Sequence, residues 1–277
     1  MTDTRTFPAL DDVFTLTPQQ IADYRENGHV FLPAVCTPQE VAEFEPVITS
    51  ASQRLNPPTR PLEERDTFGK AFTLAAGLWN RDEAVARFTL AKRFARIAAE
   101  LMGVEGVRLY HDVSINKEAG GGYTPWHQDA YYWPMDTPHT ITMWMPLVNI
   151  THEMGGLNFA SGSQHDGYLG EGISDDSQAF YDEVIARRGF PVVSHAKQRG
   201  VLKAGDATFH NGWTLHSAPA NNSDRARQVM TVVYYADGVR TFADMGNPHR
   251  EYDFKAFMPG VVPGELAASP MNPVLYP

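Results

Sequence analysis

The sequence predicts a mainly β protein, either a sandwich or a barrel, with helices in its first third. From Val107 onward, short β-prone runs are separated by Gly, Pro, Asn and Asp, a spacing typical of such folds. No internal repeat, linker or low-complexity tract divides the 277 residues, which indicates one domain over residues 1–277. The expected strands are residues 107–116, 124–133, 139–150, 156–160, 191–195, 200–210, 212–218 and 227–236.

Capping signals define the expected helices. Thr17-Pro18-Gln19-Gln20 and Thr37-Pro38-Gln39-Glu40 are capping boxes with Pro at the first helical position. They open helices that should run to Asn27 and towards Leu55. Residues 81–102 should form a third helix, because apolar residues recur there at helical spacing and Gly103 ends the run. The helical part is expected over about residues 16–103, and the β core over about 107–240.

Two features lie outside this division. A helix at Gln178–Arg188, ended by Gly189, is expected within an insertion at about residues 164–200. This insertion is rich in Gly and Asp and is a candidate lid. The tail from Met258 is rich in Pro and should wrap the surface.

Composition excludes several classes of function. The net charge is 23 − 33 = −10, which argues against broad binding to nucleic acid or to an anionic membrane. A single cysteine, Cys36, excludes an internal disulfide and multi-cysteine metal sites. The N-terminus lacks a signal-peptide pattern, and no apolar run approaches the 18 residues of a membrane span. A soluble cytoplasmic protein is expected, and its oligomeric state is left open.

His127 and Asp129 are the first candidate site residues. On a strand, residues two apart point to the same side, so this pair would present an imidazole and a carboxylate together. These are two of the three ligands of the 2-His-1-carboxylate triad, which binds Fe(II) and leaves coordination positions open. A hydrogen-bonded polar pair on a strand would show the same pattern.

His216 and Arg227 strengthen the metal interpretation. His216 lies near the end of a strand that follows the Gly205-Asp206 turn, and Arg227 opens an apolar run. A buried Arg is costly unless it meets an anion, and a guanidinium can hold a carboxylate through two hydrogen bonds. The alternative for Arg227 is a surface pair with Asp224. The alternative third metal ligand is His210, which has the same strand parity as His216.

The ordered motifs resemble the phytanoyl-CoA dioxygenase-like (PhyH) family of Fe(II)/2-oxoglutarate-dependent oxygenases. The resemblance implies a double-stranded β-helix, that is, a jelly-roll or cupin-like fold with flanking helices, in agreement with the short strands above. The resembling segments are Leu16 to Val30, Ser114-Ile115-Asn116-Lys117, Trp126-His127-Gln128-Asp129, Gly155 to His165, and Gly205-Asp206 to His216 followed by Arg227.

The resemblance also implies residue roles. His127, Asp129 and His216 would be the catalytic iron ligands, and the spacing to Arg227 favours His216 over His210 as the third. Arg227 would clamp the distal carboxylate of the co-substrate 2-oxoglutarate. Further co-substrate contacts would come from Trp144, Thr124 and Asn158. A lysine by which the family binds the co-substrate has no clear match before residue 110.

These residues predict a dioxygenase that uses Fe(II), 2-oxoglutarate and O2. It would hydroxylate an aliphatic C–H of a small organic metabolite and release succinate and CO2. Halogenating relatives replace the carboxylate ligand with a small residue, so Asp129 predicts hydroxylation. The alternatives are a redox-silent metal-dependent hydrolase or isomerase, or a non-catalytic binding module, on the same cupin-like fold. A CoA thioester would need a basic groove, for which only Lys117, Lys197 and Arg199 are scattered candidates.

Overall fold

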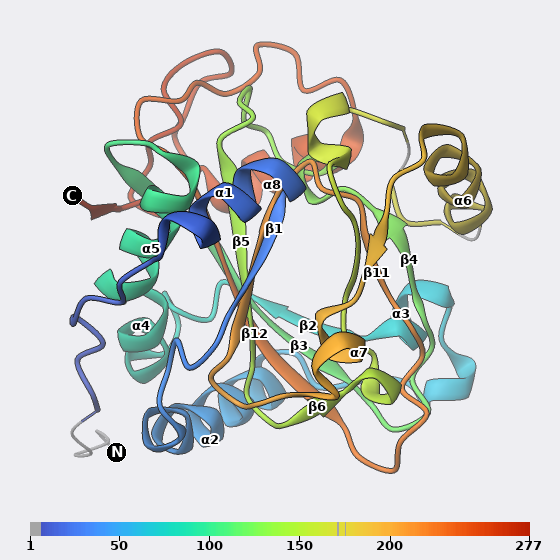
Figure 1. Ribbon diagram of the computed structural model, residues 1–277. Helices are drawn as coiled ribbons and strands as arrows, with labels where there is room; N and C mark the ends of the chain where they lie inside the picture. Colours follow the sequence, from blue (N-terminus) through green and yellow to red (C-terminus); the bar gives the residue numbers. More distant parts are fainter. Residues whose placement is uncertain (1–6, 171, 175) are drawn as a thin grey trace.

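Two antiparallel β-sheets face each other, and helices cover the outer side of the larger one (Figure 1). The computed structural model describes residues 7–170, 172–174 and 176–277. In this part of the chain, the larger sheet has seven strands in the order β1-β10-β5-β12-β3-β13, with β2 also paired to β3. These strands are β1 (His29–Leu32), β2 (Thr73–Ala76), β3 (Val107–Lys117), β5 (Thr140–Pro146), β10 (Ala207–Asn211), β12 (Arg227–Ala236) and β13 (Val274–Tyr276).

The smaller sheet closes the other side of the interior. Its order over the described residues is β4-β11-β7-β8, and β6 and β9 form a separate pair. Because no strand pairs link it to the larger sheet, the two sheets can enclose a site between them. The strands are β4 (Thr124–His127), β6 (Ile150–Thr151), β7 (Asn158–Ala160), β8 (Val192–Val193), β9 (Val201–Leu202) and β11 (His216–Ala218).

The helices begin and end largely where the capping residues predict. Thr17 and Thr37 both form complete capping boxes, and Gly28, Gly103 and Gly189 end their helices in the left-handed region. The α-helices are α1 (Pro18–Asn27), α2 (Pro38–Leu55), α3 (Thr67–Ala71), α4 (Glu83–Thr89), α5 (Lys92–Met102), α6 (Ser177–Arg188), α7 (His195–Arg199) and α8 (Pro248–Phe257). The 3-10 helices are η1 (Leu62–Glu64), η2 (Asp129–Tyr131), η3 (His152–Met154) and η4 (Ser163–Asp166).

The main core lies between the larger sheet and helices α2, α4 and α5. Strand residues with the same parity, such as Met143, Phe209 and Val232, point to this side and are fully buried. Strand neighbours with the other parity face the smaller sheet, because side chains alternate along a strand. The helices therefore hold the larger sheet from outside and leave its inner face for other side chains. No helix among the described residues is both long and apolar enough to cross a membrane.

Several sequence expectations are wrong in detail. The helix expected at 81–102 is two helices, α4 and α5, separated at Leu90 and Ala91. The strand expected at 191–195 is the two-residue β8, after which His195 begins α7. Helix α8 and strand β2 were not predicted, since neither carries strong periodicity. The tail beyond Met258 follows the surface as expected, but it ends as β13, paired with β3.

Candidate metal and co-substrate site

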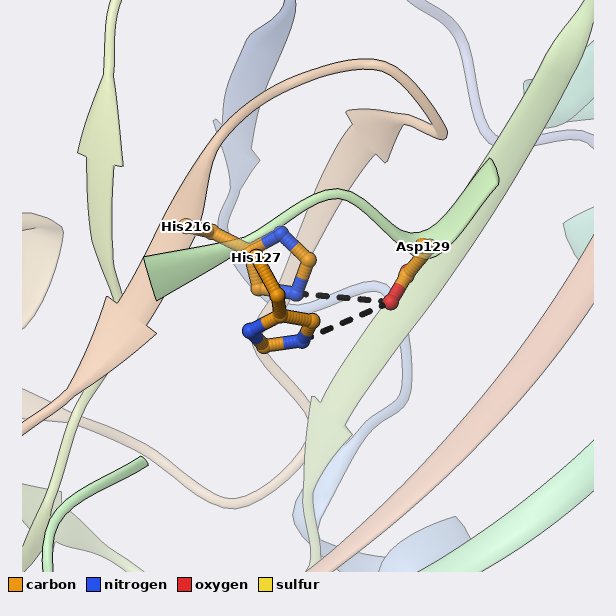
Figure 2. A group of neighbouring side chains, drawn as sticks. All are labelled: His127, Asp129 and His216. Atoms are coloured by element: carbon orange, nitrogen blue, oxygen red, sulfur yellow. Dashed lines mark ion pairs between the residues drawn. The ribbon is translucent and has the colours of Figure 1, made fainter. Parts of the chain in front are cut away.

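Three side chains converge between the two sheets. His127 ends β4 and His216 begins β11, and the two residues are directly paired across these strands. Their Nε2 atoms lie 3.6 and 3.5 Å from Oδ1 of Asp129, as Figure 2 shows. One ligand atom from each residue lies within 4.8 Å of the others, a spacing that could hold a metal ion. The predicted group of three is therefore assembled.

The route by which Asp129 reaches the group differs from the prediction. Strand β4 ends at His127, and Asp129 is the first residue of the 3-10 helix η2. The expected strand 124–133 is thus wrong beyond His127. The turn of η2, and not the alternation of a strand, brings the carboxylate to the imidazoles.

Both imidazoles are oriented as metal ligands. The Nδ1 atoms lie 2.8 Å from the carbonyl oxygen of Pro125 for His127 and 3.0 Å from that of Thr214 for His216. A carbonyl oxygen only accepts, so each Nδ1 carries the proton and each Nε2 keeps a free lone pair. Burial lowers the pKa of each ring to about 4. The rings are therefore neutral at pH 7, the form that binds a metal.

The second oxygen of Asp129 is held by the larger sheet. The Thr142 hydroxyl donates to Oδ2 at 2.9 Å, and Nε2 of His210 lies 3.2 Å from the same oxygen. Burial raises the pKa of Asp129, but His216 and His210 outweigh this and hold it below its usual range. The carboxylate is therefore ionised, and Oδ1 stays available to a metal.

His210 is thus a partner of Asp129 and lies outside the group of three. It belongs to β10 in the larger sheet, whereas His216 belongs to β11 in the smaller one. The expected shared strand parity of the two residues was wrong.

Arg227 lies inside the molecule with an unbalanced charge. Its side chain is 2% exposed, and Nη1 donates to the Gly155 carbonyl at 2.5 Å. Nε has no hydrogen-bond partner, and the guanidinium lies over the Trp144 ring at 5.4 Å. Burial lowers the pKa of Arg227 to about 9. The alternative of a surface pair with Asp224 is wrong.

Lys117 is a second buried cation, to which the sequence prediction gave no role in co-substrate binding. It is fully buried and is paired with Arg227 in the register of β3 and β12. Its ammonium group donates to the Gly122 carbonyl and lies 3.4 Å from the Thr124 hydroxyl. Burial and the charge of Arg227 lower the pKa of Lys117 to about 7. Neither cation forms an ion pair with the described acidic residues, so the two create a site for an anion.

Two of the three remaining predicted co-substrate residues contact this pair of cations, and Asn158 lies nearer to the metal group. Trp144 is buried beneath the guanidinium, and Thr124 is buried beside the ammonium group. The Asn158 amide lies 3.4 Å from the hydroxyl of Ser217, next to His216. A signal for Lys117 was present in the sequence: a lysine ends a β-prone run shortly before the metal motif. Its proximity to Arg227 depends on the pairing of β3 with β12.

Comparison with known proteins places this site in a family. The family model for phytanoyl-CoA dioxygenase (PhyH) matches residues 24–229. The chain belongs to the PhyH family. It is 25% identical over 227 residues to an L-proline trans-4-hydroxylase from Streptomyces griseoviridis, covering 76% of this chain and 83% of that one.

Solved structures extend the similarity to nearly the whole chain of this PhyH-family member. The non-haem α-ketoglutarate-dependent epimerase SnoN from nogalamycin biosynthesis matches with a TM-score of 0.73 and 23% identity, over 94% of this chain and 98% of that one. EctD from S. alaskensis, with 2-oxoglutarate and 5-hydroxyectoine, matches with a TM-score of 0.65 and 22% identity, over 86% of this chain and 83% of that one. These matches show the fold.

The predicted jelly-roll fold, family and function class are therefore confirmed. The family, the hydroxylase relative and the His-Asp-His group agree on a non-haem iron enzyme that depends on 2-oxoglutarate. The alternatives of a redox-silent enzyme and of a binding module are not favoured. The structural neighbours include an epimerase and a carbocyclase, so the family alone leaves the type of oxidation open.

Proposed function

We propose that this protein is a hydroxylase in which His127, Asp129 and His216 hold Fe(II), and Arg227 and Lys117 hold 2-oxoglutarate. The proposal rests on two sets of buried groups that lack a binding partner within the protein. Two neutral imidazoles turn their free Nε2 atoms towards one carboxylate, and two buried cations lack an anion in the same interior. A divalent metal and a dicarboxylate would satisfy both.

Each side chain has a defined task. His127, Asp129 and His216 would hold iron, which would supply O2 activation for the oxidative decarboxylation of 2-oxoglutarate. Arg227 offers two nitrogens to the distal carboxylate, and Trp144 fixes the plane of the guanidinium. Lys117 adds a second positive charge, and Thr124 orients its ammonium group. Thr142 and His210 keep Asp129 turned to the metal through its other oxygen.

Hydroxylation is the proposed outcome because Asp129 occupies the position where a halogenase needs room for a halide. The carboxylate is ionised, and Thr142 and His210 hold its Oδ2, so Oδ1 occupies the space that a chloride would need. We propose a small organic substrate, in line with the proline hydroxylase relative. Product mass separates hydroxylation from epimerisation or ring closure, since hydroxylation alone adds one oxygen atom to the substrate.

The insertion at 164–200 is proposed as the lid. Its first part contacts the metal motif directly. The Gln128 side chain donates to the Gly167 carbonyl at 2.7 Å and accepts from the Leu169 amide at 2.9 Å. Its helix α6 packs against β4, where Asp182 accepts from the Trp126 indole at 3.0 Å. Movement of this segment would therefore displace Trp126 and Gln128, the chain neighbours of His127 and Asp129.

The test combines binding and turnover. Iron-loaded protein under anaerobic conditions should develop a visible charge-transfer band on addition of 2-oxoglutarate, and should form succinate when O2 and a substrate are supplied. His127→Ala should lose both responses. His139→Ala, a change of an exposed histidine, should keep both. Absence of 2-oxoglutarate binding by the wild type, with His127→Ala indistinguishable from it, would refute the proposal.

A further inference from the structure

A row of paired residues crosses the larger sheet beside Asp129. Thr142 and His210, which bind the Asp129 carboxylate, are paired with each other in β5 and β10. Thr142 is also paired with Val233 of β12, and Val233 is paired with His111 of β3. Directly paired residues of antiparallel strands share a face of the sheet. His111 therefore projects from the face that carries the metal site.

Strand β3 has a β-bulge at this point. Val233 is paired with His111, and Tyr234 is paired with Leu109, so Tyr110 has no partner in the ladder. A bulge re-aims side chains, so that two consecutive residues can point to one side. The rings of Tyr110 and His111 accordingly lie 4.3 Å apart. Two consecutive polar side chains therefore enter the interior together.

His111 is buried without a complete set of hydrogen bonds. The residue is 8% exposed, and its Nδ1 atom has no hydrogen-bond partner. Its ring lies 4.7 Å from that of Phe257, at the end of α8. An unpaired buried polar atom costs free energy, so such an atom at the edge of an active site indicates a ligand that would pair with it.

Tyr110 connects this point to an acidic residue of α8. Its hydroxyl donates to Oδ2 of Asp253 at 2.9 Å. Burial raises the pKa of Asp253 to about 7, and the Tyr110 hydroxyl acts in the opposite direction. Tyr110 therefore links Asp253 to His111, which lies on the face of the sheet that carries the metal site.

The charge of Asp253 is not balanced by the protein. None of the described basic residues forms an ion pair with it. Arg250, one turn earlier in α8, donates to the Tyr131 carbonyl at 3.2 Å instead. Lys255 pairs with Glu251 at 3.7 Å. This partly buried carboxylate therefore lacks a cationic partner among the described residues, just as the buried Arg227 lacks an anionic partner.

Two separate parts of β12, at Arg227 and at Val233, would then lie beside different ligands. Arg227 precedes Val233 by six residues, which is about 20 Å along a strand. A bound 2-oxoglutarate is too short to span from Arg227 past the metal to His111. The polar groups on β3 and α8 are therefore left for the molecule that is oxidised.

We propose that Tyr110, His111 and Asp253 form the substrate-recognition site, and that the substrate is a small amino compound. Its positively charged nitrogen would pair with the Asp253 carboxylate, and a hydrogen-bonding oxygen would pair with Nδ1 of His111. This inference rests on the proposed function, because it takes the metal between β4 and β11 as the centre of oxidation. Helix α8 supplies the charge that selects for an amine.

The test compares amino acids with carboxylates of the same shape that lack the ammonium group. Titration calorimetry at about pH 8, where Asp253 is ionised, would use iron-loaded protein with 2-oxoglutarate in the absence of O2. The probe pairs are L-proline with cyclopentanecarboxylate, L-pipecolate with cyclohexanecarboxylate, and L-valine with isovalerate. Asp253→Asn removes the charge and keeps an oxygen acceptor for Tyr110. Glu251→Gln removes one exposed charge from the same helix and is the matched control.

The wild type should bind at least one ammonium probe tenfold or more tightly than its isostere, as expected for a charge-assisted hydrogen bond. This preference should disappear in Asp253→Asn and persist in Glu251→Gln. If Asp253→Asn does not fold, Asp253→Ser takes its place. No preference in the wild type for any pair, or an unchanged preference without the carboxylate, overturns the inference. If 2-oxoglutarate itself fails to bind in the same cell, the proposed function fails instead.

Discussion

Replacing Arg227 with methionine should separate the free-energy cost of burying this side chain from its contribution to 2-oxoglutarate binding. Arg227 is a buried cation with an unpartnered Nε and a second cation, Lys117, beside it. Methionine has a similar length, no charge and a surface that can pack on Trp144. The variant should therefore lose 2-oxoglutarate binding without losing stability in the absence of ligand.

The magnitude follows from the pKa of Arg227. Burial lowers it from 12.5 to about 9, and each pH unit corresponds to 1.36 kcal/mol, so burial of the charged form costs up to about 5 kcal/mol. Since the folded-state pKa lies above 7, the side chain is charged at pH 7 and this cost is present in full. After imperfect packing of the methionine is subtracted, Arg227→Met should raise the free energy of unfolding by about 1–3 kcal/mol.

The same change should weaken co-substrate binding. Removal of one partner from a buried, hydrogen-bonded charge pair costs about 2–5 kcal/mol, which corresponds to a roughly 30- to 5,000-fold increase in Kd. Urea unfolding followed by circular dichroism, without metal or ligand, gives the stability. Calorimetry of 2-oxoglutarate with iron-loaded protein in the absence of O2 gives the affinity.

Arg240→Met is the matched control, because Arg240 is exposed and pairs with Glu265 on the surface at 3.3 Å. It should change neither quantity by more than about 0.5 kcal/mol. The reasoning is refuted if Arg227→Met binds 2-oxoglutarate as tightly as the wild type. It is also refuted if that variant is less stable by more than about 2 kcal/mol, since the charge would then be compensated within the protein.

Three further predictions concern neighbouring residues. The pKa of Lys117 is about 7 in the folded protein. Binding of a dicarboxylate should raise this pKa, so that Lys117 takes up a proton and the affinity for 2-oxoglutarate falls between pH 7 and about pH 9. Calorimetry should show that Lys117→Met abolishes this pH dependence. His210→Phe removes a partner of Asp129 and should weaken metal binding about 10- to 100-fold in competition with a chromophoric chelator, and an unchanged affinity would contradict the role of His210. Gly28→Ala should lower the free energy of unfolding by at least about 2 kcal/mol in urea titrations, because Gly28 has φ 76° and an added Cβ would collide with the Thr214 hydroxyl. A loss below about 0.5 kcal/mol would show that this turn can relax.

The three proposed iron ligands and Arg227 could be inferred from the sequence because each belongs to a short local pattern. These residues can be identified by their order along the chain, which is a His-x-Asp motif, then a histidine, then an arginine. This order does not depend on the structure of the loops between them. The capping boxes at Thr17 and Thr37 likewise depend only on residues within one turn, and both formed as predicted. Where the prediction relied on continuation of a pattern, it was wrong, as in the helix broken at Leu90 and the strand that ends at His127.

The tertiary structure decided how distant residues meet. Lys117 reaches Arg227 through the register of β3 with β12, and His210 reaches Asp129 through the register of β10 with β5. A bulge at Tyr110 turns His111 inward towards α8, a helix that was not predicted from the sequence. Strand register is set by the summed packing of both faces of a sheet, and no short stretch of sequence carries that sum. The sequence by itself therefore determined which three residues could be proposed as metal ligands, and the fold determined which charges surround them.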